Sequence, residues 1–533
     1  MEDKYTWWKH GVIYHLYVRS FYDSNNDGIG DLRGIIEKLD YLKELGIDAI
    51  WLSPIFKSPQ KDFGYDIEDY QLIDPQYGSN EDFAELLKKA HQKGIKIILD
   101  MVLNHTSNKH PWFIESRSSI NNPKRNWYIW KKKIPNNWKT FSGSKAWSYD
   151  KITDEYYLHS FYKEQPDLNW RNSEVEKAMF KQLQHWLDKG VDGFRLDVIN
   201  YLAKDKKYRN NPNFLQQLFF KAKTYNRNRK KSIAIVKSLR KLLDNYQDKV
   251  SIGEIYTLPP GDSKLVSKYL GNGEDALHLA LDFSLMFTPW NPRKYALALQ
   301  NCYKNIPKKG WPSISMSNHD IVRAYSKHFF HKTEKSKLMA MLLLTAYGTP
   351  FIYYGEEIGL SAKAIPRSKM QDQLGKKFWP FYQGRDRLRS PMQWNDAAFG
   401  GFSNTNPWLP LNNTYRVVNV DNQKNDENSL FSLFKKLIEL RKELEILQKG
   451  DWQIIDALNR KILAYKRFYN EEEIFVYLNF SNVSRNFKKQ NGSIVFSTHS
   501  NSQDTVLHPF EGRIIYNKST NLNISNKKCS VDS

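Results

Sequence analysis

Through most of the chain, short apolar runs alternate with longer amphipathic stretches. The stretches Glu81–Lys93 and Ala178–Lys189 place apolar residues at helical spacing and therefore predict helices. The short runs predict eight strands: Val12–Arg19, Ala49–Pro54, Ile95–Val102, Gly193–Val198, Val250–Ile255, Leu277–Asp282, Ser313–Ser317 and Pro350–Tyr354. Because strands that alternate with helices form parallel sheets, eight such units favour a closed (β/α)₈ TIM barrel, an α/β fold, over an open doubly wound sheet.

Two segments depart from this alternation. Residues 105–172, rich in Trp, Tyr, Asn and Ser, are too many for an ordinary loop after the third strand and predict a small inserted domain, the B domain. After a predicted helix at Leu430–Lys442 the pattern changes to short strands: Ile454–Ile455, Ile462–Arg467, Ile474–Asn479 and Gly512–Tyr516. We therefore assign 1–104 and 173–447 to the barrel and 448–533 to a C-terminal all-β sandwich, with a partly disordered tail over 517–533.

Composition narrows the class of protein. No apolar run approaches the roughly 20 residues of a membrane-spanning helix, and the polar N-terminus lacks the apolar core of a signal peptide. The two cysteines, Cys302 and Cys529, are too few for a disulfide framework and fit a reducing compartment. We therefore expect a cytoplasmic protein with no membrane partner, and a monomer.

The chain is strongly basic, with a formal net charge of +22. Such a charge is typical of some nucleic-acid-binding proteins. The basic residues are nevertheless scattered, with only short clusters such as Lys131–Lys133 and Arg227–Lys231, and no nucleic-acid-binding motif accompanies them. We interpret the charge as solvated surface and expect no nucleic-acid partner.

The ends of four predicted strands carry the candidate chemistry. In a (β/α)₈ barrel the catalytic groups lie at the C-terminal ends of the strands. The polar residues at these ends are Asp100, Asn104 and His105, Arg195 with Asp197, Glu254, and Asn318 to Asp320. Glycoside hydrolysis needs one carboxylate at the anomeric carbon and one carboxylic acid at the leaving oxygen, and a neighbouring Arg keeps the first ionised. One such carboxylate would be interpreted as a capped strand end, but four on one barrel face favour a glycosidase site.

These four segments, with Gln165-Pro166-Asp167-Leu168-Asn169 in the insertion, resemble the five signature regions of the α-amylase superfamily of glycoside hydrolases, family 13. The resemblance covers nearly the whole chain, from Gly11-Val12-Ile13-Tyr14 to the C-terminal β domain. The Gln-Pro-Asp-Leu-Asn form looks like the oligo-1,6-glucosidase and α-glucosidase branch. In that branch Arg389-Ser390-Pro391-Met392-Gln393-Trp394 also finds its counterpart.

The resemblance implies a role for each matching position. It makes Asp197 the nucleophile and Glu254 the general acid/base, and it lets Asp320 bind the 2- and 3-hydroxyls of the sugar. The residues implied to surround the glucose are Asp62, Tyr65, His105, Phe161, Arg195 and His319. Arg389 is implied to pair with Asp62 and to close the far end of the pocket, which would explain exo action.

Two positions bear on specificity. Val198 follows the nucleophile and is expected to face the leaving sugar; an apolar Val there looks like the α-1,6-acting enzymes of the branch, whereas Thr or Ala looks like the α-1,4-acting ones. The alternative is that Val198 only packs the strand end. The segment from Phe141 to Trp147 is shifted by one residue from the usual pattern of the branch, which leaves the role of Phe141 open.

An early loop is a candidate metal site. Residues Asp23 to Asp31 place oxygen-bearing groups at alternate positions with Gly28 at the sixth, as in the first part of an EF-hand, although Gly34 at the twelfth excludes a complete one. A polar turn that caps the next helix is the alternative. The relatives hold a structural Ca²⁺ here, so the resemblance implies a calcium site with these ligands: the side chains of Asp23, Asn25, Asp27 and Asp31 and the carbonyl of Ile29.

The sequence therefore predicts a retaining, exo-acting α-glucosidase that releases glucose from short oligosaccharides and favours α-1,6 links. Other enzyme activities stay open: an α-1,4-glucosidase or transglucosylase, and a trehalose-6-phosphate hydrolase, whose anionic substrate the basic charge favours. A non-catalytic relative associated with transporters is the hypothesis from another class. Such proteins carry a membrane segment and often lack the catalytic carboxylates, and this sequence shows neither feature.

Overall fold

A computed structural model describes residues 4–220, 222–327, 332–456, 458–500 and 503–518. Its centre is an eight-stranded parallel sheet in the order β11-β10-β9-β5-β2-β1-β13-β12. The strands are β1 (Ile13–Leu16), β2 (Ala49–Leu52), β5 (Lys96–Met101), β9 (Gly193–Leu196), β10 (Val250–Glu254), β11 (Leu279–Leu281), β12 (Ser313–Ser315) and β13 (Thr349–Tyr353). The two end strands, β11 and β12, also contact each other, so the sheet forms a nearly closed barrel. All eight predicted strands and the TIM barrel are confirmed.

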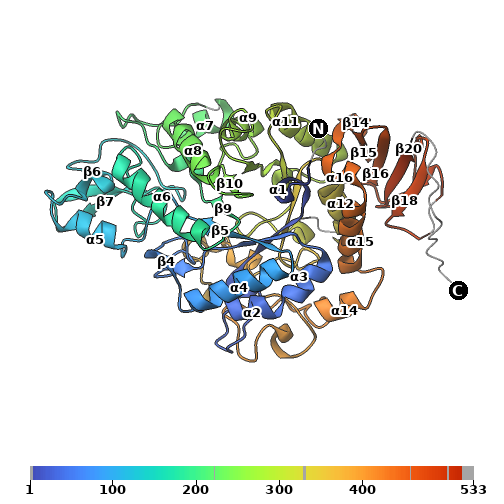
Figure 1. The fold of residues 1–533 in the computed structure, drawn as a ribbon, viewed down its shortest axis with the longest axis horizontal. Helices are drawn as coiled ribbons and strands as arrows, with labels where there is room; N and C mark the ends of the chain where they lie inside the picture. Colours follow the sequence, from blue (N-terminus) through green and yellow to red (C-terminus); the bar gives the residue numbers. More distant parts are fainter. Residues whose placement is uncertain (1–3, 221, 328–331, 457, 501–502, 519–533) are drawn as a thin grey trace.

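Helices surround this barrel (Figure 1). They are α1 (Trp7–His10), α2 (Leu32–Glu37), α3 (Leu39–Leu45), α4 (Asn80–Gln92), α6 (Ser173–Asp188), α7 (Phe214–Phe220), α8 (Lys230–Leu243), α9 (Ser263–Ser267), α10 (Ser284–Phe287), α11 (Pro292–Asn305), α12 (Lys332–Thr345), α13 (Gln373–Phe378), α14 (Val420–Lys424), α15 (Leu430–Glu443) and α16 (Glu445–Lys449). The predicted helices correspond to α4, α6 and α15. Among the described residues, none of the helices combines the length and the apolar character needed to cross a membrane.

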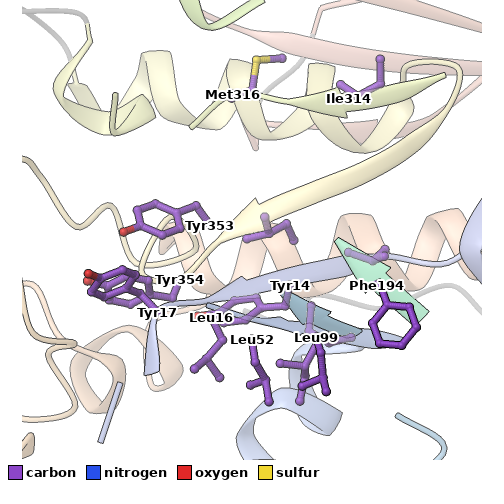
Figure 2. Close-up of a cluster of buried hydrophobic side chains, with 14 of the residues drawn as sticks. Tyr14, Leu16, Tyr17, Leu52, Leu99, Phe194, Ile314, Met316, Tyr353 and Tyr354 are labelled. Carbon is purple, nitrogen blue, oxygen red and sulfur yellow. The ribbon is translucent and has the colours of Figure 1, made fainter. Parts of the chain in front are cut away.

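The strands direct successive side chains to opposite faces, and this alternation separates two apolar layers. Leu16, Leu52, Leu99 and Phe194 point away from the barrel centre (Figure 2) and belong to the large core under the helices. Their inward neighbours form a second cluster: Ile13, Ala49, Trp51, Ile98, Val250, Ile252, Leu279, Leu281 and Phe351. Because side chains alternate along each strand, every second polar side chain at the strand ends also points inward, into the mouth of the barrel.

The insertion and the C-terminal segment lie at opposite ends of the molecule (Figure 1). The insertion holds α5 (Pro111–Ser118) and an antiparallel sheet of β6 (Trp130–Lys131), β7 (Trp147–Asp150) and β8 (Glu155–Leu158). A separate short hairpin of β3 (Phe56–Lys57) and β4 (Asp69–Ile73) lies earlier in the chain, between β2 and α4. The insertion contacts the barrel end through hydrogen bonds from the Leu168 amide to the Asn104 carbonyl at 2.9 Å and from Trp170 Nε1 to the Leu103 carbonyl at 2.7 Å. The predicted insertion after the third barrel strand is therefore confirmed, while its limits at 105 and 172 stay a prediction.

The C-terminal segment is an antiparallel all-β region, as predicted. Its five-stranded sheet runs in the order β14-β15-β16-β20-β18, beside a two-stranded sheet of β17 and β19. The strands are β14 (Asp451–Ile454), β15 (Ile462–Tyr469), β16 (Glu472–Asn479), β17 (Arg485–Asn486), β18 (Ser493–Ser497), β19 (Val506–Leu507) and β20 (Gly512–Lys518). Inward residues such as Tyr465 and Val476 join the main core, whereas Ile515 and Leu507 form a separate cluster on the other face. The predicted disorder after Asn517 falls almost wholly on 519–533, outside the described residues.

Candidate active site

One arginine organises the carboxylates at the barrel mouth. The period of β9 turns Arg195 inward, where its side chain is fully buried. Its Nη1 lies 2.8 Å from Asp100 Oδ1 and 2.9 Å from Asp197 Oδ1, and its Nη2 lies 2.5 Å from Glu254 Oε2. Three strands, β5, β9 and β10, thus deliver their terminal carboxylates to a single guanidinium. Charge-assisted contacts of this kind fix the carboxylates in position before any substrate arrives.

The backbone is strained immediately after Asp197. Val198 has φ 36° and ψ 44°, in the left-handed region that a β-branched residue rarely adopts. Its amide donates to Glu254 Oε2 at 3.3 Å, a contact that ties the end of β9 to the end of β10. Such strain costs of order 1–3 kcal/mol and persists where the surroundings enforce it. Here it makes the chain turn sharply enough that Asp197 and Val198 both line the same cavity.

The carboxyl groups at the mouth differ in their titration. Burial raises the pKa of Asp197, the neighbouring Glu254 and Asp100 add to the rise, and the charge of Arg195 opposes it. Burial likewise raises the pKa of Asp100, to about 6. Burial acts in the same direction on Asp320, but the positive charges around it prevail and hold its pKa below the ordinary value. Asp320 is therefore ionised at neutral pH.

Two buried histidines stand beside these carboxyl groups. Burial lowers the pKa of His105 to about 4 and that of His319 to about 3, so both imidazoles are neutral at neutral pH. The Tyr65 hydroxyl donates to Asp100 Oδ2 at 3.1 Å and lies 2.8 Å from His319 Nε2, which must then donate to it. His105 Nε2 lies 3.0 Å from the carbonyl oxygen of Tyr65. The histidines thus hold Tyr65 in place without adding positive charge.

A second pair of arginines closes the far end of the pocket, and here the sequence prediction was wrong. Arg385, not Arg389, pairs with Asp62, with Nη2 2.7 Å from Oδ1. Arg389 Nη2 instead lies 2.6 Å from Asp320 Oδ1, and its Nε donates to the carbonyl of His319. The short helical turn Asp386–Leu388 separates the two arginines, so they reach different carboxylates.

These groups enclose a small cavity of about 90 Å³, which we call the catalytic pocket. Its lining is Asp62, Tyr65, His105, Phe141, Phe161, Gln165, Asp197, Val198, Tyr201, Glu254, Tyr256, Asp320 and Arg385. Glu254, Tyr256, Asp320 and Arg385 also line an outer cavity of about 330 Å³. The structure therefore gathers eight of the predicted site residues on one cavity wall and places Arg195, His319 and Arg389 directly behind that wall.

Several pocket residues escaped the sequence analysis. Arg385 lies 323 residues from Asp62 in an irregular segment, so no periodic pattern connects the two. Tyr201 and Tyr256, which follow β9 and β10, also line the pocket, but in the sequence nothing distinguishes them from other aromatic residues. Phe141, whose role the sequence left open, lines the pocket, and its ring centroid lies 5.3 Å from that of Phe161. Its position beside Phe161 makes it part of the aromatic wall.

The predicted calcium loop is held by its own hydrogen bonds. Asp23 is buried, accepts from the amides of Asn26 and Gly28 at 2.8 Å each, and accepts from the Ser403 hydroxyl at 2.6 Å. Asp31 caps α2 by accepting from the Gly34 amide at 2.7 Å, and it also accepts from the Ser24 amide and hydroxyl. Within the described residues, no three His, Cys, Asp or Glu side chains gather closely enough to hold a metal. The all-oxygen donor set suits Ca²⁺, and Asp31 Oδ2, which accepts only from the Ser24 amide, retains a lone pair for a cation.

Comparisons with known proteins agree with this geometry. Residues 15–450 match the model of the alpha-amylase family described as alpha amylase, catalytic domain. The chain is 39% identical to the oligo-1,6-glucosidase of Parageobacillus thermoglucosidasius, over 89% of this chain and 90% of the relative. It is 36% identical to the probable alpha-glucosidase of Rhizobium meliloti (strain 1021), over 90% of each chain.

Solved structures extend the likeness to the whole fold. The alpha-glucosyl transfer enzyme XgtA superposes with a TM-score of 0.90 at 35% identity, covering 97% of this chain and all of the other. A variant of the trehalulose synthase MutB superposes equally well at 31% identity, covering 96% of this chain and all of the other. Fold, site and sequence agree in this: the chain belongs to the alpha-amylase family.

Proposed function

We propose that the chain is a retaining, exo-acting α-glucosidase that removes glucose from the non-reducing end of short α-glucosides. The observation that carries this proposal is that Arg195, behind the pocket wall, joins Asp100 to Asp197 and Glu254, which line a pocket closed at its far end. The named relatives, oligo-1,6-glucosidases and alpha-glucosidases, support the same activity.

The reaction divides between two carboxyl groups. Asp197 attacks the anomeric carbon while Glu254 gives its proton to the leaving glycosidic oxygen, so that a glucosyl ester forms on Asp197 and the leaving sugar departs as an alcohol. Glu254 then takes a proton from water, the resulting hydroxide attacks the anomeric carbon, and the ester bond breaks. Two inversions at the same carbon give net retention. Arg195 contacts both carboxylates throughout and stabilises the charge that moves between them.

Closure of the pocket accounts for exo action. The ion pair of Arg385 with Asp62 lies on the pocket wall, and Asp62 also accepts from Gln165 Nε2 at 3.2 Å. Because these side chains are locked to one another, a sugar chain has no exit past the terminal glucose. Asp62 retains lone pairs for the hydroxyls of that glucose, whose ring lies over Tyr65 in this proposal.

Initial rates on a panel of isomaltose, maltose, sucrose, trehalose and trehalose-6-phosphate test the substrate. We expect isomaltose to have the highest kcat/KM, since Val198 offers the leaving sugar no hydrogen-bond partner. Glucose release from none of the five would contradict the proposal. A preference for maltose would contradict only the linkage.

Transfer to a sugar is a second candidate, favoured by the structural likeness to an alpha-glucosyl transfer enzyme. The outer cavity adjoins Glu254 and Tyr256, so an acceptor sugar bound there would lie beside the attacking position. The ratio of trisaccharide to glucose formed at high isomaltose concentration separates the two fates of the glucosyl ester. We expect hydrolysis to predominate at low substrate concentration and transfer to grow with it.

We also propose that the Asp23–Asp31 loop binds one structural Ca²⁺ and that the protein is a cytoplasmic monomer. The support for calcium is the buried, firmly held Asp23 and the oxygen donors of Asn25 and Asp27 beside it. A ligand that binds only the folded state stabilises it by mass action. Addition of a chelator should therefore lower the melting temperature, and re-added Ca²⁺ should restore it, with kcat changed little. An unchanged melting temperature would contradict the calcium proposal.

A further inference from the structure

A large cavity outside the catalytic pocket is strongly basic. Its volume is about 830 Å³, and eight of its lining side chains are Arg or Lys against one Asp. We call it the basic cavity. It lies between the start of α8, which supplies Lys230 and Lys231, and the segment around α9, which supplies Lys264 and Lys268. Positive charge from two separate elements thus lines one cavity that is open to solvent.

Most of this charge is not balanced by the protein itself. Among the described residues, Lys223, Lys230, Lys264 and Lys268 have no ion pair that would neutralise them, whereas Arg229 and Lys231 reach carboxylates only at 3.3 Å. Like charges that face one another across a cavity repel, and an anion between them removes the repulsion.

Two further features point to an anion. The N-terminus of α8 opens into the cavity, and its N-cap residue Arg229 makes no side-chain cap hydrogen bond. The Ser232 amide donates to the Arg229 carbonyl, so the amides of Lys230 and Lys231 are those that a ligand at this 14-residue helix could use. Arg227 also lines the cavity; its side chain is about nine-tenths buried, and its two Nη atoms donate to the Tyr201 hydroxyl and to Gln217 Oε1, both neutral groups. No carboxylate among the described residues forms an ion pair with Arg227, so an anion in the cavity would balance a charge that the protein leaves unpaired.

The basic cavity is connected to the catalytic pocket. A groove of about 590 Å³ shares Arg227 and Leu258 with the basic cavity, and it shares Tyr201 and Tyr256 with the catalytic pocket. Arg227 Nη1 donates to the Tyr201 hydroxyl at 3.2 Å, so one hydrogen bond spans the junction. A molecule in the groove can therefore contact both ends.

We infer that the basic cavity binds a phosphate group at the N-terminus of α8. Helix amides and Arg or Lys side chains together are the chemistry that recognises a dianionic phosphate. The phosphate has two possible sources: free inorganic phosphate, or a phosphate on the leaving sugar of a substrate that extends along the groove. Only the second source rests on the proposed glucosidase activity; the site itself does not.

Calorimetric titration with inorganic phosphate tests the site directly. The double variant Lys230→Gln/Lys268→Gln removes one charge from each side of the cavity and touches no residue of the catalytic pocket. Each lost charge-assisted hydrogen bond weakens binding, so Kd should rise at least about tenfold. The matched control is Lys241→Gln, an exposed lysine in the last turn of the same helix, which should leave Kd unchanged. No phosphate binding by the wild-type protein, or an equal loss in the control, would overturn the inference.

Kinetics then distinguish the two sources. The kcat/KM of isomaltose 1-phosphate is compared with that of isomaltose in the wild-type protein and in the double variant. If the phosphate belongs to the substrate, the wild-type protein prefers the phosphorylated sugar and the double variant loses that preference. If it is free phosphate, the ratio stays the same while the calorimetric Kd still rises. Absence of isomaltose hydrolysis would overturn the proposed function and leave the calorimetric result intact.

Discussion

The catalytic pocket and the basic cavity are joined by one groove but balance charge in opposite ways. In the pocket, Arg195, Arg385 and Arg389 each contact at least one carboxylate at 2.9 Å or less. In the basic cavity, lysines such as Lys230 and Lys268 line one cavity with a single Asp. A cation paired with a carboxylate holds the protein's own groups in position, whereas an unpaired cation can bind an anion from outside the protein.

The largest expected effect lies in the pocket. Asp197→Asn removes the nucleophile and Glu254→Gln removes the proton donor, so each should lower kcat on isomaltose by about 10⁴-fold or more. With an aryl α-glucoside whose leaving group needs little acid help, Glu254→Gln should still release a burst of phenol. Circular dichroism spectra check that both variants are folded. Retention of most of the activity in either variant would refute the assigned roles.

The paired and unpaired cations should also differ in what they contribute to stability. Arg385→Leu leaves the buried carboxylates of Asp62 and Asp372 without their cationic partner, so the free energy of unfolding should fall by about 3–5 kcal/mol. Lys230→Gln removes an exposed charge from the basic cavity and should change it by less than about 0.5 kcal/mol. Chemical denaturation of both variants measures the contrast. A similar change in the free energy of unfolding for the two variants would contradict the distinction between paired and unpaired cations.

Substrate linkage gives a smaller effect. Val198→Thr puts a hydroxyl on the pocket wall at nearly constant volume, and we expect the kcat/KM ratio of isomaltose to maltose to fall by about 1–3 kcal/mol in equivalent free energy. Val198→Ile is the apolar control and should keep the preference for isomaltose. An unchanged ratio in Val198→Thr would mean that Val198 only packs the strand end.

The smallest effect concerns pH. Asp197 must be ionised to attack, so kcat/KM falls as the pH drops through its pKa. The negative charge of Asp100 contributes to the raised pKa of Asp197, so Asp100→Asn should lower that pKa and move the acidic limb of the kcat/KM profile to lower pH. The alkaline limb serves as the internal control. A shift of the acidic limb to higher pH would contradict this electrostatic account.

Local pattern and long-range contact explain what the sequence could predict. The eight barrel strands and the catalytic carboxylates at their ends follow from a period of two and from strand order, both of which are local. The pair of Asp62 with Arg385 depends on an irregular segment 323 residues away, so the resemblance led to the wrong arginine. Strand β18 was missed because a bulge between Ile494 and Phe496 disturbs its register and its side chains are mostly half-exposed.

The basic cavity was hidden for a related reason. The cluster Arg227–Lys231 reads along the chain as an ordinary solvated surface. The fold brings this cluster to the same cavity as Lys264 and Lys268. These two lysines are more than 30 residues further along the chain, so no short motif contains both groups. The function of a basic cluster therefore depends on which residues the fold places around the same cavity, and the composition of the chain does not contain that information.

Trapping the covalent intermediate tests the central claim most directly. The wild-type protein is incubated with 5-fluoro-α-glucosyl fluoride, which slows hydrolysis of the glucosyl ester, and then digested and mapped by mass spectrometry. A single fluoroglucosyl group on Asp197 is the result that a retaining double displacement requires. A label on Glu254 or on another carboxylate, or release of β-glucose as the first product of isomaltose hydrolysis, would contradict the account.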